Sequence, residues 1–189
     1  MTTTLLVVLG LAGLVVLYVI VTYNALVRAR NQVREAWSGI EVQMKRRYNL
    51  IPNLVETVKG YAAHEQDTLE QVIQARGAAM NNNGTPTEQA TDENQLGVAL
   101  RGLLALSESY PDLKANESFQ NLQGELAETE DQIQFARRYY NGVVRDNNTK
   151  VDQFPSNLVA RAFTFIKAEF FELEESEAAA RQPVPVSFD

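Results

Sequence analysis

The sequence predicts an all-α protein in which a single N-terminal transmembrane helix continues into an antiparallel bundle of long helices. Three features of the 189-residue chain support this fold class. An uncharged apolar run fills residues 5–21, and apolar side chains then recur at helical spacing over most of the chain. Before the C-terminal tail, no stretch shows a convincing strand pattern.

The apolar run from Leu5 to Val21 is the candidate membrane anchor. It holds seventeen residues without a charge, and the next two bring it near the roughly 20 residues that a bilayer requires. A cleaved signal peptide is the alternative, but residues 1–4 carry no basic side chain and no A-x-A-like site follows the run. We therefore expect a transmembrane helix over 5–25, with these anchor residues: Leu5, Leu9, Leu14, Tyr18 and Tyr23.

Basic residues after the run predict its orientation. Arg28, Arg30 and Arg34 follow it, whereas no Lys or Arg precedes it. The positive-inside rule places residues 1–4 outside the cytoplasmic membrane and residues 26–155 in the cytoplasm as a helical bundle. Residues 1–50 carry a net charge of +4, and the remainder of the −7 chain carries −11. The basic stretch either attracts anionic headgroups or only fixes the topology.

The first long helix is predicted from a heptad stripe between Val33 and Tyr61. Stripe positions alternate at spacings of four and three, as in a packed bundle or coiled coil. Pro52 lies inside the stripe without breaking its register, so we favour one helix with a bend near Pro52. Two helices that meet at Asn49 are the alternative. The stripe consists of Val33, Trp37, Ile40, Met44, Arg47, Ile51, Leu54, Val58 and Tyr61.

Arg47 is unusual because a stripe position normally holds an apolar residue. A buried guanidinium requires a carboxylate partner, and Glu125, Asp131 and Asp146 are the candidates. Alternatively, the bend at Pro52 turns Arg47 toward solvent. Trp37, on the same stripe, is interpreted as a core aromatic residue.

Further helices follow from caps and periodicity. The second has Leu69, Val72, Ile73, Arg76 and Met80 on one side. Residues 81–92 read as a loop that contains a capping box, from which a third helix runs to about residue 109. Asn116 is expected to cap a fourth helix over about 117–153. A helical segment over 156–178 and an extended tail over 179–189 complete the chain.

The composition excludes most chemistry. Cysteine is absent and His64 is the single histidine, so thiolate catalysis and multi-histidine metal centres are not available. No phosphate-binding loop or nucleophile motif occurs, and the acidic balance is a poor match for nucleic acid. We expect no enzyme activity, no cofactor and no metal.

Several polar and aromatic residues are candidates for interactions instead. Residues 137–141 combine arginine with tyrosine, which suits a polar layer between helices or a protein surface, and the last segment has phenylalanines on both sides. Exposed apolar strips usually mark partner surfaces. The interaction candidates are Arg28, Arg30, Trp37, Arg47, Arg137, Arg138, Tyr139, Phe170 and Phe171.

Three blocks of residues resemble the LemA family. They are Arg30-Asn31-x-Val33-x-x-Ala36-Trp37-Ser38, Leu50-Ile51-Pro52-Asn53-Leu54-Val55 and Ala136-Arg137-x-Tyr139-Tyr140-Asn141. The resemblance implies a bacterial or archaeal membrane-anchored protein with a helical bundle and without an established enzyme activity. It also implies links to the shaping of internal membranes and to membrane proteases, although fold alone does not transfer a function.

Two functional hypotheses result. The first is a membrane-anchored scaffold that self-associates and organises or shapes the membrane, with lipid and further copies of the chain as partners. The second is an adaptor for a membrane protease or another envelope protein. Its binding surface would be the tail, because alternating side chains suit strand addition to a partner's sheet.

Overall fold

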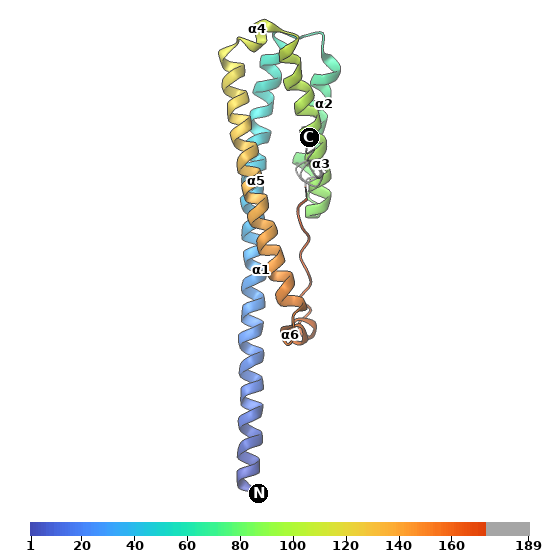
Figure 1. The fold of residues 1–189 in the computed structure, drawn as a ribbon. Helices are drawn as coiled ribbons and strands as arrows, with labels where there is room; N and C mark the ends of the chain where they lie inside the picture. The colour runs from blue at the N-terminus through green and yellow to red at the C-terminus, as the bar shows by residue number, and fades with distance from the viewer. Residues whose placement is uncertain (173–189) are drawn as a thin grey trace, which may run out of the picture. The chain divides into compact units, whose positions relative to one another are not determined.

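A computed structural model describes residues 1–172, and every regular element in this range is helical (Figure 1). The described residues contain no strand, which confirms the all-α prediction. The predicted tail and residues 173–178 of the predicted last helix lie outside this range. In chain order the elements are α1 (Thr2–Lys59), α2 (Gln66–Asn81), α3 (Pro86–Ala105), the 3-10 turn η1 (Leu106–Glu108), α4 (Pro111–Lys114), α5 (Glu117–Asp152) and α6 (Ser156–Ala162).

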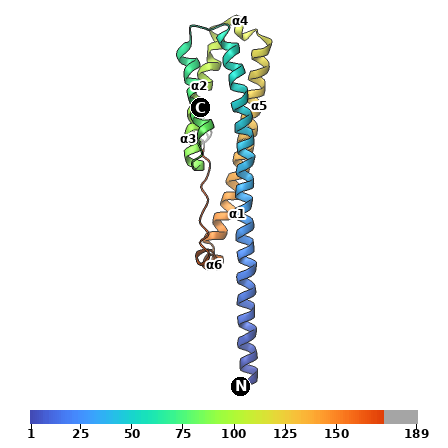
Figure 2. The same ribbon diagram turned by 180° about the vertical axis from the view of Figure 1, so that it is seen from behind.

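The described chain divides into two compact units. Among the described residues, unit 1 contains 1–39 and 138–168, and unit 2 contains 40–137 and 169–172. The long helices α1 and α5 contribute to both units, whereas α6 belongs to unit 1. The second view of the ribbon shows α2 and α3 side by side within unit 2 (Figure 2).

The helix α1 is continuous through Pro52, which confirms the single-helix prediction. A proline lacks the N–H that would pair with the carbonyl four residues earlier, here the carbonyl of Tyr48. The Arg76 Nε of α2 donates a hydrogen bond of 2.7 Å to that carbonyl oxygen. The guanidinium therefore satisfies the acceptor that Pro52 leaves unpaired, and the buried stripe on both sides of Pro52 holds the helix against α2 and its neighbours.

The core of unit 2 follows the predicted stripes of α1, α3 and α5. On α2, however, Ile73 and Met80 are exposed, so the prediction that they share the packed side was wrong. Leu69, Val72 and Ala79 form the buried face instead. The buried apolar residues of the core from the other helices include Ile40, Met44, Ile51, Leu54, Val58, Leu96, Leu100, Leu103, Leu126 and Ile133.

The predicted caps of α3 and α5 are present. Thr85 and Glu88 form a capping box, with the Thr85 N–H donating to Glu88 Oε2 over 2.8 Å and Pro86 in the first turn. At α5, the Phe119 N–H donates to Asn116 Oδ1 over 2.9 Å. These side chains satisfy N–H groups that have no partner within the helix.

The last helix is much shorter than predicted. Instead of continuing from 156 toward 178, α6 ends at Ala162. Thr164 has a positive φ of 56°, and the Phe165 N–H donates to the Ala160 carbonyl over 2.9 Å. This is the hydrogen-bond pattern of a Schellman turn, which closes a helix, so Ile166 and Phe170 do not lie on a helical face.

Candidate functional site

The first candidate site is the exposed apolar surface of α1 in unit 1. Residues 1–18 are all exposed, including Leu5, Leu9 and Leu14. An 18-residue window of α1 has a mean hydropathy of 2.9 and none of it is buried. It is the one helix of residues 1–172 that is long and apolar enough to cross a membrane. This finding is compatible with a single N-terminal anchor.

The chain becomes partly covered at the C-terminal end of this surface. Val19 is the first residue of α1 that is not fully exposed, and Leu26 is completely buried. Tyr18 and Tyr23 keep about two fifths of their surface accessible, which suits rings placed at an interface. Arg28 and Arg30 are exposed in the turns that follow.

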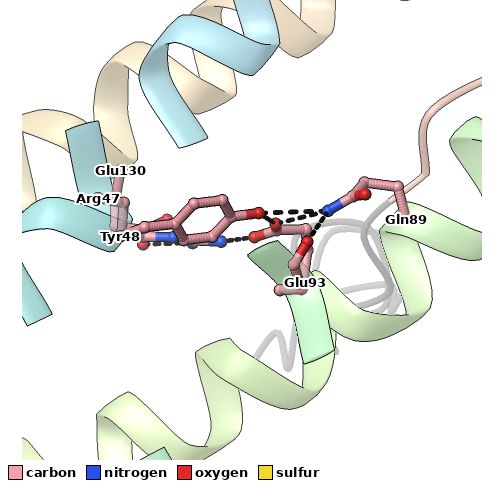
Figure 3. Close-up of polar contacts among 6 residues, drawn as sticks. Arg47, Tyr48, Gln89, Glu93 and Glu130 are labelled. Atoms are coloured by element: carbon pink, nitrogen blue, oxygen red, sulfur yellow. Dashed lines mark hydrogen bonds and ion pairs between the residues drawn. The ribbon is translucent and has the colours of Figure 1, made fainter. Parts of the chain in front are cut away.

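The second candidate site is a buried polar cluster in unit 2, which α1, α3 and α5 build together (Figure 3). Arg47 of α1 is only 2% exposed. One of its terminal nitrogens pairs with the Glu93 carboxylate of α3, which is equally buried, and Nη1 donates to Glu130 Oε1 of α5 over 2.5 Å. The prediction that Arg47 is buried with a carboxylate partner is confirmed, but its partners are not Glu125, Asp131 or Asp146.

Tyr48 and Gln89 complete the cluster. The Tyr48 hydroxyl donates to Glu93 Oε1. Gln89 Nε2 donates to the same carboxylate oxygen over 2.9 Å and to the Ala79 carbonyl over 3.0 Å. Burial raises the pKa of the Tyr48 phenol, and this outweighs the opposite effect of the Arg47 charge.

The arrangement favours a structural role over catalysis. The Glu93 carboxylate is paired with a guanidinium and accepts from a phenol and an amide, so its oxygens are already engaged. Beside the cluster is an open cleft of about 300 Å³, whose lining includes Arg47, Glu93, Leu100 and Leu126. No group of three or more metal-ligating side chains occurs in residues 1–172.

The interaction candidates from the sequence fall into three groups by exposure. Arg28, Arg30, Arg138, Tyr139 and Phe170 are exposed to solvent. Trp37 is half-buried and packs on Tyr140, with ring centroids 5.3 Å apart. Arg47, Arg137 and Phe171 are buried, which for Arg137 matches the polar layer between helices that was one of the two interpretations of residues 137–141.

Sequence reasoning missed Glu93, Gln89 and Glu130. A signal for the first two was present, because the α3 stripe of Leu96 and Leu100 reaches Glu93 and Gln89 when it is extended backward at spacings of three and four. A charged residue on the stripe of α3 thus matches the opposite charge on the stripe of α1. No comparable signal identifies Glu130, which lies beside its stripe rather than on it.

Comparisons with known proteins identify a family match and several relatives. The model of the LemA family matches residues 36–188. Protein LemA of Metamycoplasma hominis is 30% identical over 155 residues, which are 82% of this chain and 70% of that protein. Magnetosome protein MamQ 2 of Paramagnetospirillum magneticum is 26% identical, and MamQ of Magnetospirillum gryphiswaldense is 24% identical. Each alignment with a magnetosome protein covers 79% of this chain and 64% of the relative, slightly less than two thirds of its length.

Proposed function

This chain belongs to the LemA family, and we propose that it is a non-enzymatic, membrane-anchored helical scaffold that self-associates and organises or shapes the membrane. The proposal depends on one observation above all. From Leu5 to Tyr18 the apolar side chains surround α1 on all sides and remain accessible. Exposure of these apolar side chains to water is unfavourable, whereas their transfer into the hydrocarbon core of a bilayer is favourable. The helix also satisfies its own backbone hydrogen bonds there.

The charge distribution supports a single pass with the bulk of the chain in the cytoplasm. Arg28, Arg30 and Arg34 follow the apolar run, and no acidic residue occurs before Glu35. Basic residues beside a membrane helix favour the cytoplasmic side. In this topology unit 2 is a cytoplasmic antiparallel bundle.

Exposed apolar side chains on unit 2 support self-association. Val42, Ile73, Val98 and Phe135 each leave more than half of their surface accessible, and they come from four different helices. Contacts between copies of the chain would bury these side chains and stabilise an assembly at about 25 cal/mol per Å² of apolar area removed from water.

Two considerations support a non-enzymatic role. The buried carboxylate of Glu93 is bound within the Arg47 cluster and is not available as a base. The names of the relatives, protein LemA and the magnetosome proteins MamQ, also refer to no reaction or substrate.

The particle mass of the full chain in lipid nanodiscs tests the scaffold. We expect assemblies of several copies whose mass falls when Val98→Glu and Phe135→Glu place charges on the exposed apolar positions. The matched control is Glu128→Gln, at an exposed site of α5. A strictly monomeric particle at high concentration would contradict self-association. Extraction of the chain from membranes by alkaline wash would contradict the anchor.

A further inference from the structure

The α6 foot, which we define as residues 156–167, is folded against the C-terminal end of the apolar run of α1 (Figure 1). Its Val159 and Ala160 form a small buried cluster with Leu26, and Val19 and Phe165 pack against this cluster. The foot therefore covers the last turns of the segment that we propose to cross the bilayer.

Aromatic contacts fix the turn that follows α6. The ring centroids of Phe163 and Phe165 lie 4.9 and 5.6 Å from that of Tyr23, both edge-on. The Arg30 guanidinium lies 5.3 Å from the Phe165 centroid. The turn is thus held where the apolar run gives way to the first arginines, the position that aromatic side chains favour at a membrane boundary.

The remaining surface of the foot is unusually apolar for a part of the chain in water. Leu158, Phe163 and Ile166 are 58%, 51% and 80% exposed, and the neighbouring Phe154 is 72% exposed. Several exposed large apolar side chains within one short segment mark an interaction site. Because this surface lies close to the apolar run of α1, the environment that covers it is the bilayer.

The length of the apolar run places the foot at the bilayer boundary. The run begins at Leu5, after three threonines, and the first residue covered by the foot is Val19. At 1.5 Å per residue this distance is about 21 Å, against roughly 30 Å for a hydrocarbon core. If α1 spans the hydrocarbon core, the boundary between hydrocarbon and headgroups therefore lies C-terminal to Val19, at the level of the foot.

The charges of the foot match the headgroup region. Residues 156–167 contain Arg161 and Lys167 and no acidic residue. Lys167 pairs with Asp152 over 2.6 Å, so Arg161 supplies the unbalanced charge, and Arg28 and Arg30 add two more on α1. Positive charge at this level attracts anionic lipid headgroups.

We infer that the α6 foot is a second membrane contact, which inserts the side chains of Leu158, Phe163 and Ile166 into the boundary between headgroups and hydrocarbon while its arginine faces anionic phosphates. The inference rests on the proposed membrane anchor. In addition to the anchor, the foot would insert apolar side chains beside α1 into one leaflet only. A scaffold with this geometry displaces lipid on one side of the bilayer.

Depth-dependent quenching tests the foot. Because the chain contains no cysteine, single cysteines at Leu14, Leu158, Ile166 and Val98 accept one environment-sensitive fluorophore each. Each labelled full-length variant is placed, one copy per nanodisc, in a mixture of neutral and anionic phospholipid that carries a nitroxide on the acyl chain near the headgroup. Val98 is the matched control, because it is 61% exposed on unit 2.

We expect the probes at 158 and 166 to lose emission to the nitroxide lipid and to shift to the blue, whereas the probe at 98 does neither. If the probe at 14 senses the bilayer but those at 158 and 166 remain as water-exposed as that at 98, the foot is not a membrane contact and the anchor stands. If the probe at 14 is also water-exposed, the anchor itself fails. Burial of 158 and 166 only in nanodiscs with several copies would assign the surface to a second copy of the chain and overturn the inference.

Discussion

The hydrogen bond from Arg76 to the backbone of α1 leads to a double-mutant test. Arg76→Met removes a charged donor from the Tyr48 carbonyl, which has no N–H partner because residue 52 is proline. Loss of a hydrogen bond with a charged group costs about 1.5–3 kcal/mol. In a Pro52→Ala background the alanine N–H supplies the missing donor. There the same change should cost less than about 1 kcal/mol, a coupling of about 1–2 kcal/mol.

Urea unfolding of the full chain in mild detergent, followed by far-ultraviolet circular dichroism, measures these free energies. Pro52→Ala alone should raise stability, because proline is about 3 kcal/mol worse than alanine within a helix. Gln74→Met is the control on α2, since its amide bonds only to Glu70 on the exposed surface, and it should change little in either background. Equal costs of Arg76→Met with and without Pro52 would refute the proposed compensation.

Three further predictions concern charged and titrating groups. Arg47→Met leaves the buried Glu93 carboxylate without its counterion and should lower the free energy of unfolding by about 3–5 kcal/mol. The control Arg46→Met, at an exposed side chain, should cost less than about 1 kcal/mol. Equal losses in urea unfolding would contradict the burial argument. Burial raises the pKa of Tyr48 above 10.0, so the unfolded chain loses this proton first and stability should fall as the pH rises above 10; Tyr48→Phe should reduce that slope in unfolding measured at alkaline pH. Hydrogen bonds, chiefly the one from Thr87, lower the pKa of Glu169 below 4.5. The Thr87–Glu169 contact is therefore present above pH 4.5 and is lost as the pH falls through the lowered pKa. An NMR titration in which the Glu169 carboxyl shift has its midpoint at pH 4.5 or above would contradict this contact.

Local signals made much of the fold predictable. The caps at Thr85 and Asn116 depend on residues three positions apart, and the stripe of α1 depends on periodicity within a single helix. Both are visible in one sequence, because the interacting groups are neighbours along the chain.

Features that depend on which helices pack together were harder to predict, even where the stripe of α3 indicated that Glu93 is buried. The carboxylate that pairs with Arg47 lies 46 residues away on α3, and proximity along the chain gave no reason to choose Glu93. Periodicity also continued past Ala162, whereas the chain adopts a positive φ at Thr164 and packs the following phenylalanine near Tyr23. In this turn Phe165 is partly buried whereas Phe163 and Ile166 are exposed, so the apolar pattern of the segment does not correspond to one helical face, and the length of α6 was overestimated.

The buried cluster also determines the register in which α1 packs along its neighbouring helices. If α1 slipped by one heptad along α3, Leu54 would replace Arg47 opposite Glu93, and the buried Glu93 carboxylate would lose its counterion. Such a slip is far more costly than the exchange of one aliphatic contact for another. A stack held together only by leucine and isoleucine has several nearly equivalent alignments, whereas this one has a single preferred alignment, set by a charge that α1 contributes and α3 and α5 neutralise.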